Sequence, residues 1–393
     1  MRFAFQIQAS LTLLLAPSLA LAQGNGTVEK GAAYGFATGV TGGGSAAPAA
    51  PKDNDELKAW LSDKTPRVIL LDKTFDFIGT EGSASGPGCY QTDCPLNKGG
   101  QSYIGDLSCG GGGKTTTSVK YDKAGQDPLE VASDKTLLGV GATGVLKGKG
   151  LKLAEKAKNV IIRNIHITEI NPHAVWGGDA LALNGNDGVW IDHNKFSKTA
   201  RMFILSAYNP VRVTISNNEF DGATTTSATC NKEHYWATMF GTDGDQITLD
   251  QNYWHDISGR SPKLGGDNGK STTQATNNFF ENSLGHSFEI YPSASVLIEG
   301  NQFKNVETPM DPSAEKLNTI YNVPDAASAS ACTKILGRAC VMNAFVGATT
   351  KWPSLKNEAV LNTFKGVSEY LVKPYDVGKT EAQVKANAGV GRI

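Results

Sequence analysis

The sequence is short of charge, and neither sign dominates. Only 19% of its 393 residues are Asp, Glu, Lys or Arg, and the formal net charge is −1 at pH 7. A chain with so little net charge offers no bulk field that would hold nucleic acid or an anionic membrane surface. We therefore expect no nucleic acid and no membrane among its partners.

Long apolar runs are missing after residue 22. No later stretch reaches the roughly 20 apolar residues that a membrane span needs. Residues 1–22 contain one basic residue, Arg2, then an apolar run through Leu11–Leu15 and an A-x-A site at Ala20–Ala22. This pattern is typical of a secretory signal. We expect residues 1–22 to be removed and residues 23–393 to form one secreted, extracellular β-helix domain.

The sequence also lacks the spacing of a metal site. It has no C-x-x-C pair and its six histidines are scattered, so zinc ligation is disfavoured. An even number of cysteines in a secreted chain favours three disulfides, among fifteen possible pairings that the sequence does not resolve. The cysteines are Cys89, Cys94, Cys109, Cys230, Cys332 and Cys340. A glycan is predicted on Asn25, because Asn25-Gly26-Thr27 is a sequon.

What the sequence does contain is a repeat. Each copy has an apolar residue, two others, Asn, one other residue and then a ring, as in Ile191-Asp192-His193-Asn194-Lys195-Phe196. The copies are centred on Asn164, Asn194, Asn218, Asn252, Asn278 and Asn301, at spacings of 30, 24, 34, 26 and 23 residues. Uneven spacings of this size are typical of a solenoid with insertions.

The chemistry of the repeat predicts an all-β solenoid. The segments between copies are β-branched and aromatic with period-two alternation, and they contain no amphipathic helix of useful length. A single-domain right-handed parallel β-helix fits, because each coil buries its apolar face by stacking on the next. The Asn side chains would then stack in one turn and bond along the axis. Independent hairpins are the alternative, although they favour Asn-Gly loops and shorter spacing.

The ends of the solenoid are predicted from local signals. Asp53 followed by Glu56 indicates the start of a short helix, which would cap the open N-terminal end of the solenoid. Strands are expected at 67–72, 135–139 and 144–147.

Three other segments are expected to lack helices and regular sheets. Gly79–Lys114 is interpreted as a long loop, Ala326–Cys340 as a loop closed by its two cysteines, and the chain from Pro374 as a wrapping strand or coil.

Charged, aromatic and glycine residues are concentrated in short islands. The islands are V-W-G-G-D-A at Val175–Ala180, V-W-I-D-H-N at Val189–Asn194, A-R-M-F at Ala200–Phe203, H-Y-W at His234–Trp236 and S-G-R-S-P-K at Ser258–Lys263. Together with Tyr34–Gly44, Val145–Gly150, Lys158–Ile162 and Ser227–Cys230, they resemble fungal pectin lyases over almost the whole mature chain. The resemblance implies a single right-handed parallel β-helix and no cofactor. A long solenoid with almost no net charge is also expected to be a monomer.

The resemblance implies a reaction as well, the eliminative cleavage of highly methyl-esterified polygalacturonan (pectin). The proton on C5 leaves, the bond from C4 to the glycosidic oxygen breaks, and negative charge that develops on the ester oxygen must meet a cation or donors. Arg260 would be the base. Because an ordinary Arg has a pKa of ~12.5 to 13.8 and stays protonated, a role in stabilising charge is the alternative.

A second Arg is implied to stand in for calcium. In pectate lyases, a related branch, calcium held by an acidic cluster neutralises the substrate carboxylate. Here Gly177 replaces one carboxylate of that cluster, and Arg201 would occupy the place of the ion and pair with Asp179. An ordinary buried salt bridge is the alternative. Lys263 would donate to the substrate carbonyl or else only solvate a turn.

Aromatic residues are implied to form the floor of the binding site. Trp176, Tyr235 and Trp236 would stack on sugar rings, whereas Trp190 and Trp254 are expected in the core. The pair Asp192 and His193 is expected to be structural. The sequence departs from the family just before the third cysteine, where Ser108 replaces an aromatic residue, and again at Met239. The floor is therefore expected to be thinner.

Two other functions remain open. A calcium-dependent pectate lyase is disfavoured by Gly177, by Arg201 and by Gly265, which stands where that branch tends to carry a second Arg. A non-catalytic, secreted polysaccharide-binding β-helix is disfavoured because it would not need Arg260, Arg201 and Asp179.

Overall fold

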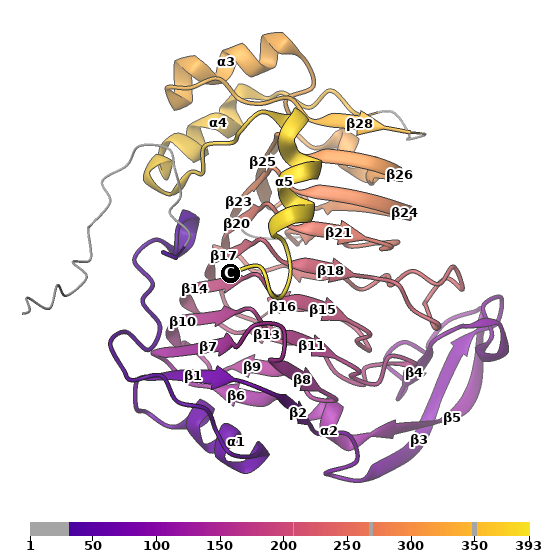
Figure 1. Cartoon of the computed structure of the whole chain (residues 1–393). Coiled ribbons are helices and arrows are strands. Elements are labelled where there is room, and N and C mark those ends of the chain that lie inside the picture. The colour runs from indigo at the N-terminus through magenta and orange to yellow at the C-terminus, as the bar shows by residue number, and fades with distance from the viewer. Residues whose placement is uncertain (1–30, 207, 267–269, 348–351) are drawn as a thin grey trace, which may run out of the picture.

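The computed structural model describes residues 31–206, 208–266, 270–347 and 352–393. The predicted signal peptide at 1–22 and the predicted glycan site at Asn25 lie outside the described residues. The chain winds into a parallel β-helix whose coils stack along one axis (Figure 1), so the predicted fold is confirmed.

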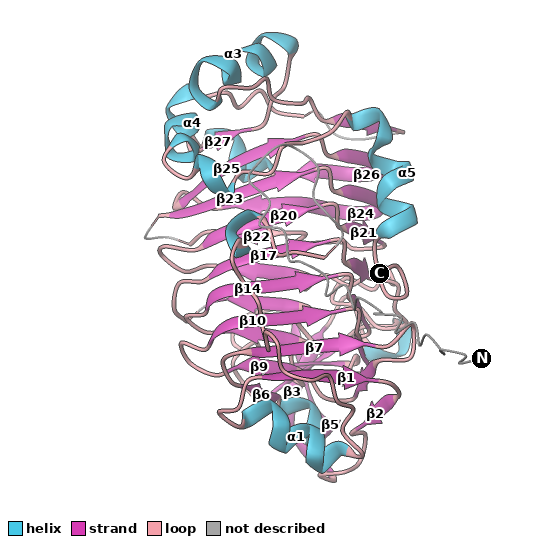
Figure 2. Ribbon diagram, turned by 60° about the vertical axis from the view of Figure 1, so that its left-hand side comes forward, coloured by secondary structure: helices cyan, strands magenta, loops and turns pink. Residues whose placement is uncertain are grey.

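Three parallel sheets form the walls of the solenoid (Figure 2). Sheet 1 runs in the order β1 (Arg67–Leu71), β7 (Lys135–Gly139), β10 (Lys158–Arg163), β14 (Asp187–Asp192), β17 (Arg212–Ser216), β20 (Gln246–Asp250), β23 (Ser271–Thr276), β25 (Ala294–Glu299) and β27 (Ile320–Tyr321). Sheet 2 contains β2 (Thr74–Asp76), β8 (Val145–Lys147), β11 (His166–Thr168), β15 (Lys195–Ser197), β18 (Glu219–Asp221), β21 (Tyr253–His255), β24 (Phe279–Ile290), β26 (Gln302–Met310) and β28 (Ala344–Val346). Sheet 3 contains β6 (Leu129–Val131), β9 (Leu151–Leu153), β13 (Leu181–Leu183), β16 (Ile204–Ser206), β19 (Thr238–Phe240), β22 (Lys263–Leu264) and the end of β24, which joins it to sheet 2.

The turn between sheets 1 and 2 carries the predicted ladder of Asn side chains from Asn194 onward. The prediction is wrong for Asn164, whose Nδ2 donates to the carbonyls of Gly139 and Gly141 instead. Asn252 shows the pattern: its Nδ2 donates to Asn278 Oδ1 at 2.9 Å, and its Oδ1 accepts from Asn218 Nδ2 at 3.0 Å. The same bonds link Asn194 to Asn218 and Asn278 to Asn301. The ladder ends at Asn343, which the sequence analysis missed. These amides are buried, and each satisfies its neighbour in the next coil.

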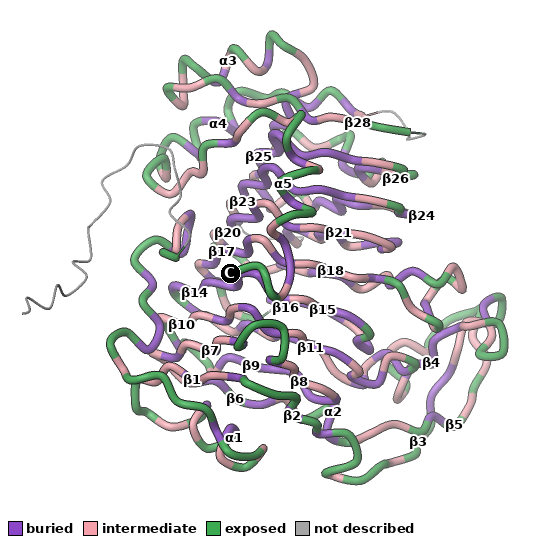
Figure 3. The backbone as a smooth tube through the Cα atoms, in the orientation of Figure 1, coloured by how far each residue is buried: buried purple, intermediate pink, exposed green. Residues whose placement is uncertain are grey.

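From the copy centred on Asn194 onward, the ring of each copy packs in the core, two residues after the Asn. In the copy centred on Asn164, His166 pairs with Lys195 and is only partly buried, and Ile167 stands beside the core ring Phe196 instead. From Phe220 to Trp254 the ring centres are 4.0 Å apart, and from Phe280 to Phe303 they are 4.7 Å apart. The stack consists of Phe196, Phe220, Trp254, Phe280, Phe303 and Phe345. Buried residues recur in coil after coil of the solenoid, as Figure 3 shows, whereas exposed residues are frequent on the capping helices and outer loops.

The N-terminal end is capped as predicted. Helix α1 (Asn54–Ser62) begins after Asp53, whose side chain accepts from the N–H of Glu56 at 2.9 Å. Its buried residues Leu57 and Leu61 belong to the main core. The apolar edge of the first coil is therefore covered by a helix.

The prediction of a loop at Gly79–Lys114 is wrong. Strands β3 (Ser83–Gln91) and β5 (Lys114–Asp122) pair antiparallel over nine residues each, and β4 (Ser102–Ile104) joins them beside β12 (Ala174–Val175). Two disulfides anchor this small sheet, Cys89–Cys109 within it and Cys94–Cys230 to the solenoid. The short helix α2 (Lys123–Gln126) follows β5.

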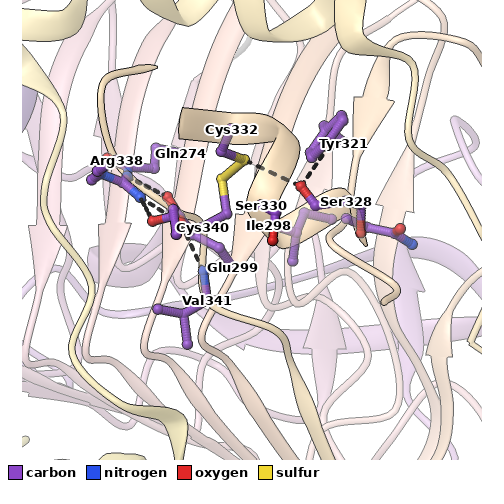
Figure 4. Close-up of a disulfide and its surroundings, with 12 residues drawn as sticks. Gln274, Ile298, Glu299, Tyr321, Ser328, Ser330, Cys332, Arg338, Cys340 and Val341 are labelled. Atoms are coloured by element: carbon purple, nitrogen blue, oxygen red, sulfur yellow. Dashed lines mark hydrogen bonds and ion pairs between the residues drawn. A yellow bond between two sulfur atoms is a disulfide. The ribbon is translucent and has the colours of Figure 1, made fainter. Parts of the chain in front are cut away.

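The predictions of a loop at Ala326–Cys340 and of a strand or coil after Pro374 are also wrong, because both segments contain a helix. Residues 326–340 hold helix α3 (Ala326–Leu336), which Asp325 and Ser328 start with reciprocal capping bonds, and the third predicted disulfide, Cys332–Cys340, ties its end (Figure 4). Helix α4 (Glu358–Lys365) packs beside α3, and the chain after Pro374 forms helix α5 (Thr380–Asn387). No helix within the described ranges is long and apolar enough to cross a membrane.

Candidate active site

The row of side chains along sheet 3 contains most of the predicted site residues. Asp179 precedes β13, Arg201 precedes β16, Trp236 precedes β19 and Arg260 precedes β22. Successive strands pair in register and lie about 4.8 Å apart, so residues distant in sequence line up along the axis. The register of one sheet thus assembles the site.

Asp179 and Arg201 form a bidentate ion pair in this row. Arg201 donates from Nε to Asp179 Oδ1 and from Nη2 to Oδ2, each at 3.0 Å, and the N–H of Met202 donates to Oδ1 at 2.8 Å. The guanidinium carbon lies 4.2 Å from the centre of the Trp176 ring. The two side chains remain 14% and 19% exposed, so a fixed planar cation faces solvent here.

A groove passes this ion pair. Its cavity volume is about 670 Å³, and it is lined by Trp176, Asp179 and Arg201 together with Lys152 and residues 126–128. Arg260 lies two strands further along sheet 3, or about 10 Å by strand spacing. The site is therefore an open row that suits a chain-like ligand more than an enclosed small molecule.

Arg260 is held against aromatic faces. Its guanidinium carbon lies 4.8 Å from the Trp236 ring centre and 5.8 Å from that of Tyr235. The φ angle of Arg260 is +50°, a left-handed conformation that the chain also adopts at other turns, as at His193 and Gln251. The two aromatic faces therefore hold the guanidinium at a turn of the solenoid.

Glu289 is a site residue that the sequence analysis missed. It pairs with Lys263 across β22 and β24, where its Oε1 lies 3.1 Å from Lys263 Nζ. Its Oε2 lies 3.6 Å from Arg260 Nε and 3.3 Å from His286 Nε2. Burial by itself would raise the pKa of Glu289, but the His286 hydrogen bond and the charges of Lys263 and Arg260 outweigh it and hold the pKa at about 2. Glu289 is therefore an ionised carboxylate between two cations.

The repeat held a signal for Glu289. Lys263 follows Asn252 by 11 residues, and Glu289 follows Asn278 by the same number (263 − 252 and 289 − 278). Aligning the copies would have placed this carboxylate beside Lys263.

Hydrogen bonds orient the aromatic residues of the predicted floor. Trp176 Nε1 donates to Ser108 Oγ at 2.9 Å, and Trp236 Nε1 donates to Gln101 Oε1 at 3.3 Å. Tyr235 meets the Trp236 ring edge-on at 4.9 Å. Ser108, which stands where a ring was expected, therefore fixes the orientation of Trp176.

The Asp192–His193 pair lies elsewhere, at the end of β14 in sheet 1. The two side chains are buried and 2.6 Å apart, and Asp192 also accepts from Ser216 Oγ and Arg163 Nε. This network matches the expectation of a structural pair. Trp190 is buried under the N-terminal segment rather than in the main core, where Trp254 lies as expected.

One group of side chains outside sheet 3 has ligand atoms close enough for a metal ion. Glu219, Asp221 and His255 on sheet 2 meet within 4.8 Å. Lys195 Nζ lies 2.8 Å from Glu219 and 2.9 Å from Asp221. His255 Nε2 also lies 3.3 Å from Glu219, so these side chains form an internal ion network.

The fold and the site together define a parallel β-helix protein with a groove at the Asp179–Arg201 ion pair and two further cations, Arg260 and Lys263, along the same sheet. The chain belongs to the pectate lyase family, because the family model described as Pectate lyase matches residues 105–203 and 205–393.

Curated relatives extend over almost the whole chain. A probable pectin lyase F of Aspergillus flavus is 46% identical over 387 residues, which cover 97% of this chain and 88% of the relative. A probable pectin lyase E of Aspergillus fumigatus is 46% identical over 371 residues, with coverages of 92% and 95%.

Solved structures share the fold. A pectate lyase from Acidovorax avenae subsp. citrulli superposes with a TM-score of 0.55 at 18% identity and covers 93% of this chain and 96% of its own. A pectate lyase from Paenibacillus sp. 0602 gives 0.56 at 17% identity, with coverages of 92% and 96%. At these identities the likeness concerns the fold alone.

Proposed function

We propose that the protein is a secreted, monomeric, endo-acting pectin lyase that cleaves highly methyl-esterified polygalacturonan by β-elimination. The relatives that match nearly the whole chain are named probable pectin lyases, which supports this activity. Within the family, the Asp179–Arg201 pair is the observation that favours a pectin lyase over a calcium-dependent pectate lyase, because it supplies a fixed cation beside the groove.

The reaction requires three things of the site. A base must take the proton from C5, positive charge must meet the ester oxygen as negative charge develops, and the C4 oxygen must leave with the bond electrons so that a C4–C5 double bond forms. In the proposal Arg260 is the base, and Lys263 and Arg201 supply the positive charge. Trp176, Tyr235 and Trp236 bind the sugar rings through apolar faces.

An ester differs from a carboxylate in a way that fits this arrangement. It carries no formal charge, so the elimination needs less compensating charge than a metal ion supplies. The guanidinium of Arg201, paired with Asp179, is a singly charged cation with directed donors. We therefore propose that no calcium takes part. A calcium-dependent pectate lyase is the runner-up.

Parallel assays of two polymers test the proposal. Ultraviolet absorbance of the unsaturated product is followed with highly methylated pectin and with polygalacturonate, each with excess calcium or with chelator. Product from methylated pectin at a rate indifferent to chelator is expected. Product only from polygalacturonate with calcium would move the protein to the pectate lyase activity, and no product from either polymer would leave a binding function.

A further inference from the structure

Glu289 lies between the two cations at the far end of the row. Its carboxylate touches Lys263 with one oxygen and approaches Arg260 and His286 with the other. Glu289 is only 8% exposed, and both it and Lys263 stand on paired strands of sheet 3. The carboxylate is thus fixed by the sheet itself.

No second carboxylate of the described residues lies within ion-pair distance of Arg260 or Lys263. Arg201 has its own partner in Asp179. Glu289 therefore compensates the two cations alone, and one positive charge remains uncompensated at this end of the row. Without Glu289 this end of the row would carry two uncompensated positive charges and would favour an anionic ligand more strongly.

We propose that Glu289 is a specificity-determining residue that positions Arg260 and Lys263 and selects an esterified uronate over an ionised one. The inference rests on the proposed function. A substrate carboxylate that contacts Arg260 would lie well within a Debye length of Glu289, about 8 Å at physiological salt, so the charge of Glu289 offsets part of the attraction that Arg260 and Lys263 exert on it. The methyl ester carries no formal charge, so this offset does not weaken its binding. The same carboxylate holds the ammonium of Lys263 with one oxygen and the guanidinium of Arg260 with the other.

The substitution Glu289→Gln tests this role, because it removes the charge and keeps the shape. The quantity measured is the ratio of kcat/KM on highly methylated pectin to kcat/KM on polygalacturonate. We expect the ratio to fall at least tenfold, through a lower KM for polygalacturonate and a lower kcat on methylated pectin. Glu289→Asp, which keeps the charge, is expected to retain the ratio while kcat falls.

Glu281→Gln is the matched control. Glu281 lies on the same strand, β24, but its partners are Tyr253 and Lys385 on the side of sheet 2. This variant is expected to keep the wild-type ratio, and thermal unfolding of all three variants shows that they are folded.

Salt provides a second measurement. Raising the ionic strength from about 0.02 M to about 0.5 M shortens the Debye length severalfold, so the difference in this ratio between the wild type and Glu289→Gln is expected to shrink. If the wild type is active and folded Glu289→Gln keeps the wild-type ratio of kcat/KM values, the role of Glu289 is overturned while the proposed function stands. A wild type inactive on both polymers would overturn the proposed function and the inference with it.

Discussion

Arg201 and Asp179 are joined by two parallel hydrogen bonds, both 3.0 Å long, in which the planar guanidinium meets the carboxylate edge to edge. The Met202 N–H holds the same carboxylate from the backbone. The pair is thus fixed at three points, and its outer face points into the groove.

Removing one partner should harm both stability and activity. Asp179→Ala leaves Arg201 charged and without its hydrogen bonds, so we expect the free energy of unfolding to fall by about 2 kcal/mol and lyase activity to be lost. Urea unfolding and the product assay measure the two effects. A double variant, Asp179→Leu with Arg201→Met, should regain stability but not activity. If the single variant kept wild-type activity, the pair would be structural only.

The Asn ladder should be one of the most sensitive parts of the fold. Asn252 is fully buried, and its side chain makes bonds to Asn218, Asn278 and the carbonyl of Ile215. Asn252→Ala leaves several buried groups unpaired at about 1–3 kcal/mol each, so the urea midpoint should drop sharply. Asn97→Ala, at an exposed position, should leave it unchanged. Equal midpoints for the two variants would contradict a stabilising ladder.

Stability should decline as the pH rises through neutrality, and Glu233 is one cause. Burial and, to a smaller extent, the charges of Asp256 and Glu307 raise the pKa of Glu233 to about 7, although a hydrogen bond from the Leu284 N–H opposes the rise. A raised carboxyl pKa means that the folded state holds the proton more tightly than the unfolded state does. The contribution of protonated Glu233 to the free energy of unfolding is therefore complete below the ordinary carboxyl pKa and is lost as the pH rises through about 7.

The variant Glu233→Gln isolates this effect. It should raise Tm by a few degrees at pH 8 and change it little at pH 4, because glutamine mimics the protonated acid. Differential scanning calorimetry at the two pH values measures the difference, with Glu315→Gln at an exposed position as control. A Tm gain that is the same at both pH values would argue against titration of Glu233.

The pH dependence of the rate tests whether Arg260 is a base. An ordinary Arg is protonated at neutral pH, so a reaction that needs neutral Arg260 should accelerate about tenfold per pH unit on the alkaline side. Initial rates on methylated pectin, corrected for the enzyme-free reaction at each pH, measure this slope. A plateau from neutral to alkaline pH would instead assign Arg260 to charge stabilisation.

The sequence predicted the solenoid because its determinants are local and repeated. Each Asn and the ring two residues later fall within six residues, so the ladder and the core stack can both be recognised without knowledge of the fold. Asn343 was missed although Cys340-Val341-Met342-Asn343-Ala344-Phe345 fits the pattern. The insertion of helix α3 places it 42 residues after Asn301 (343 − 301), beyond the earlier spacings.

The parts that could not be predicted depend on contacts between distant segments. Strands β3 and β5 contain few apolar residues and include Gly86, Pro87 and Gly88, so no alternation marks them, and their pairing follows from tertiary context. The roles of Arg201 and Arg260 came from resemblance. Glu289 required the register of sheet 3, which places it beside Lys263.

The most direct test of the account is the initial rate of unsaturated product formation by Arg260→Ala on highly methylated pectin. The variant should fold with a Tm near that of the wild type and lose at least about a hundredfold in rate. Arg212→Ala, which removes a guanidinium from sheet 1 instead, is the control and should remain active. A folded Arg260→Ala with a rate within a few fold of the wild type would contradict the assignment of this site.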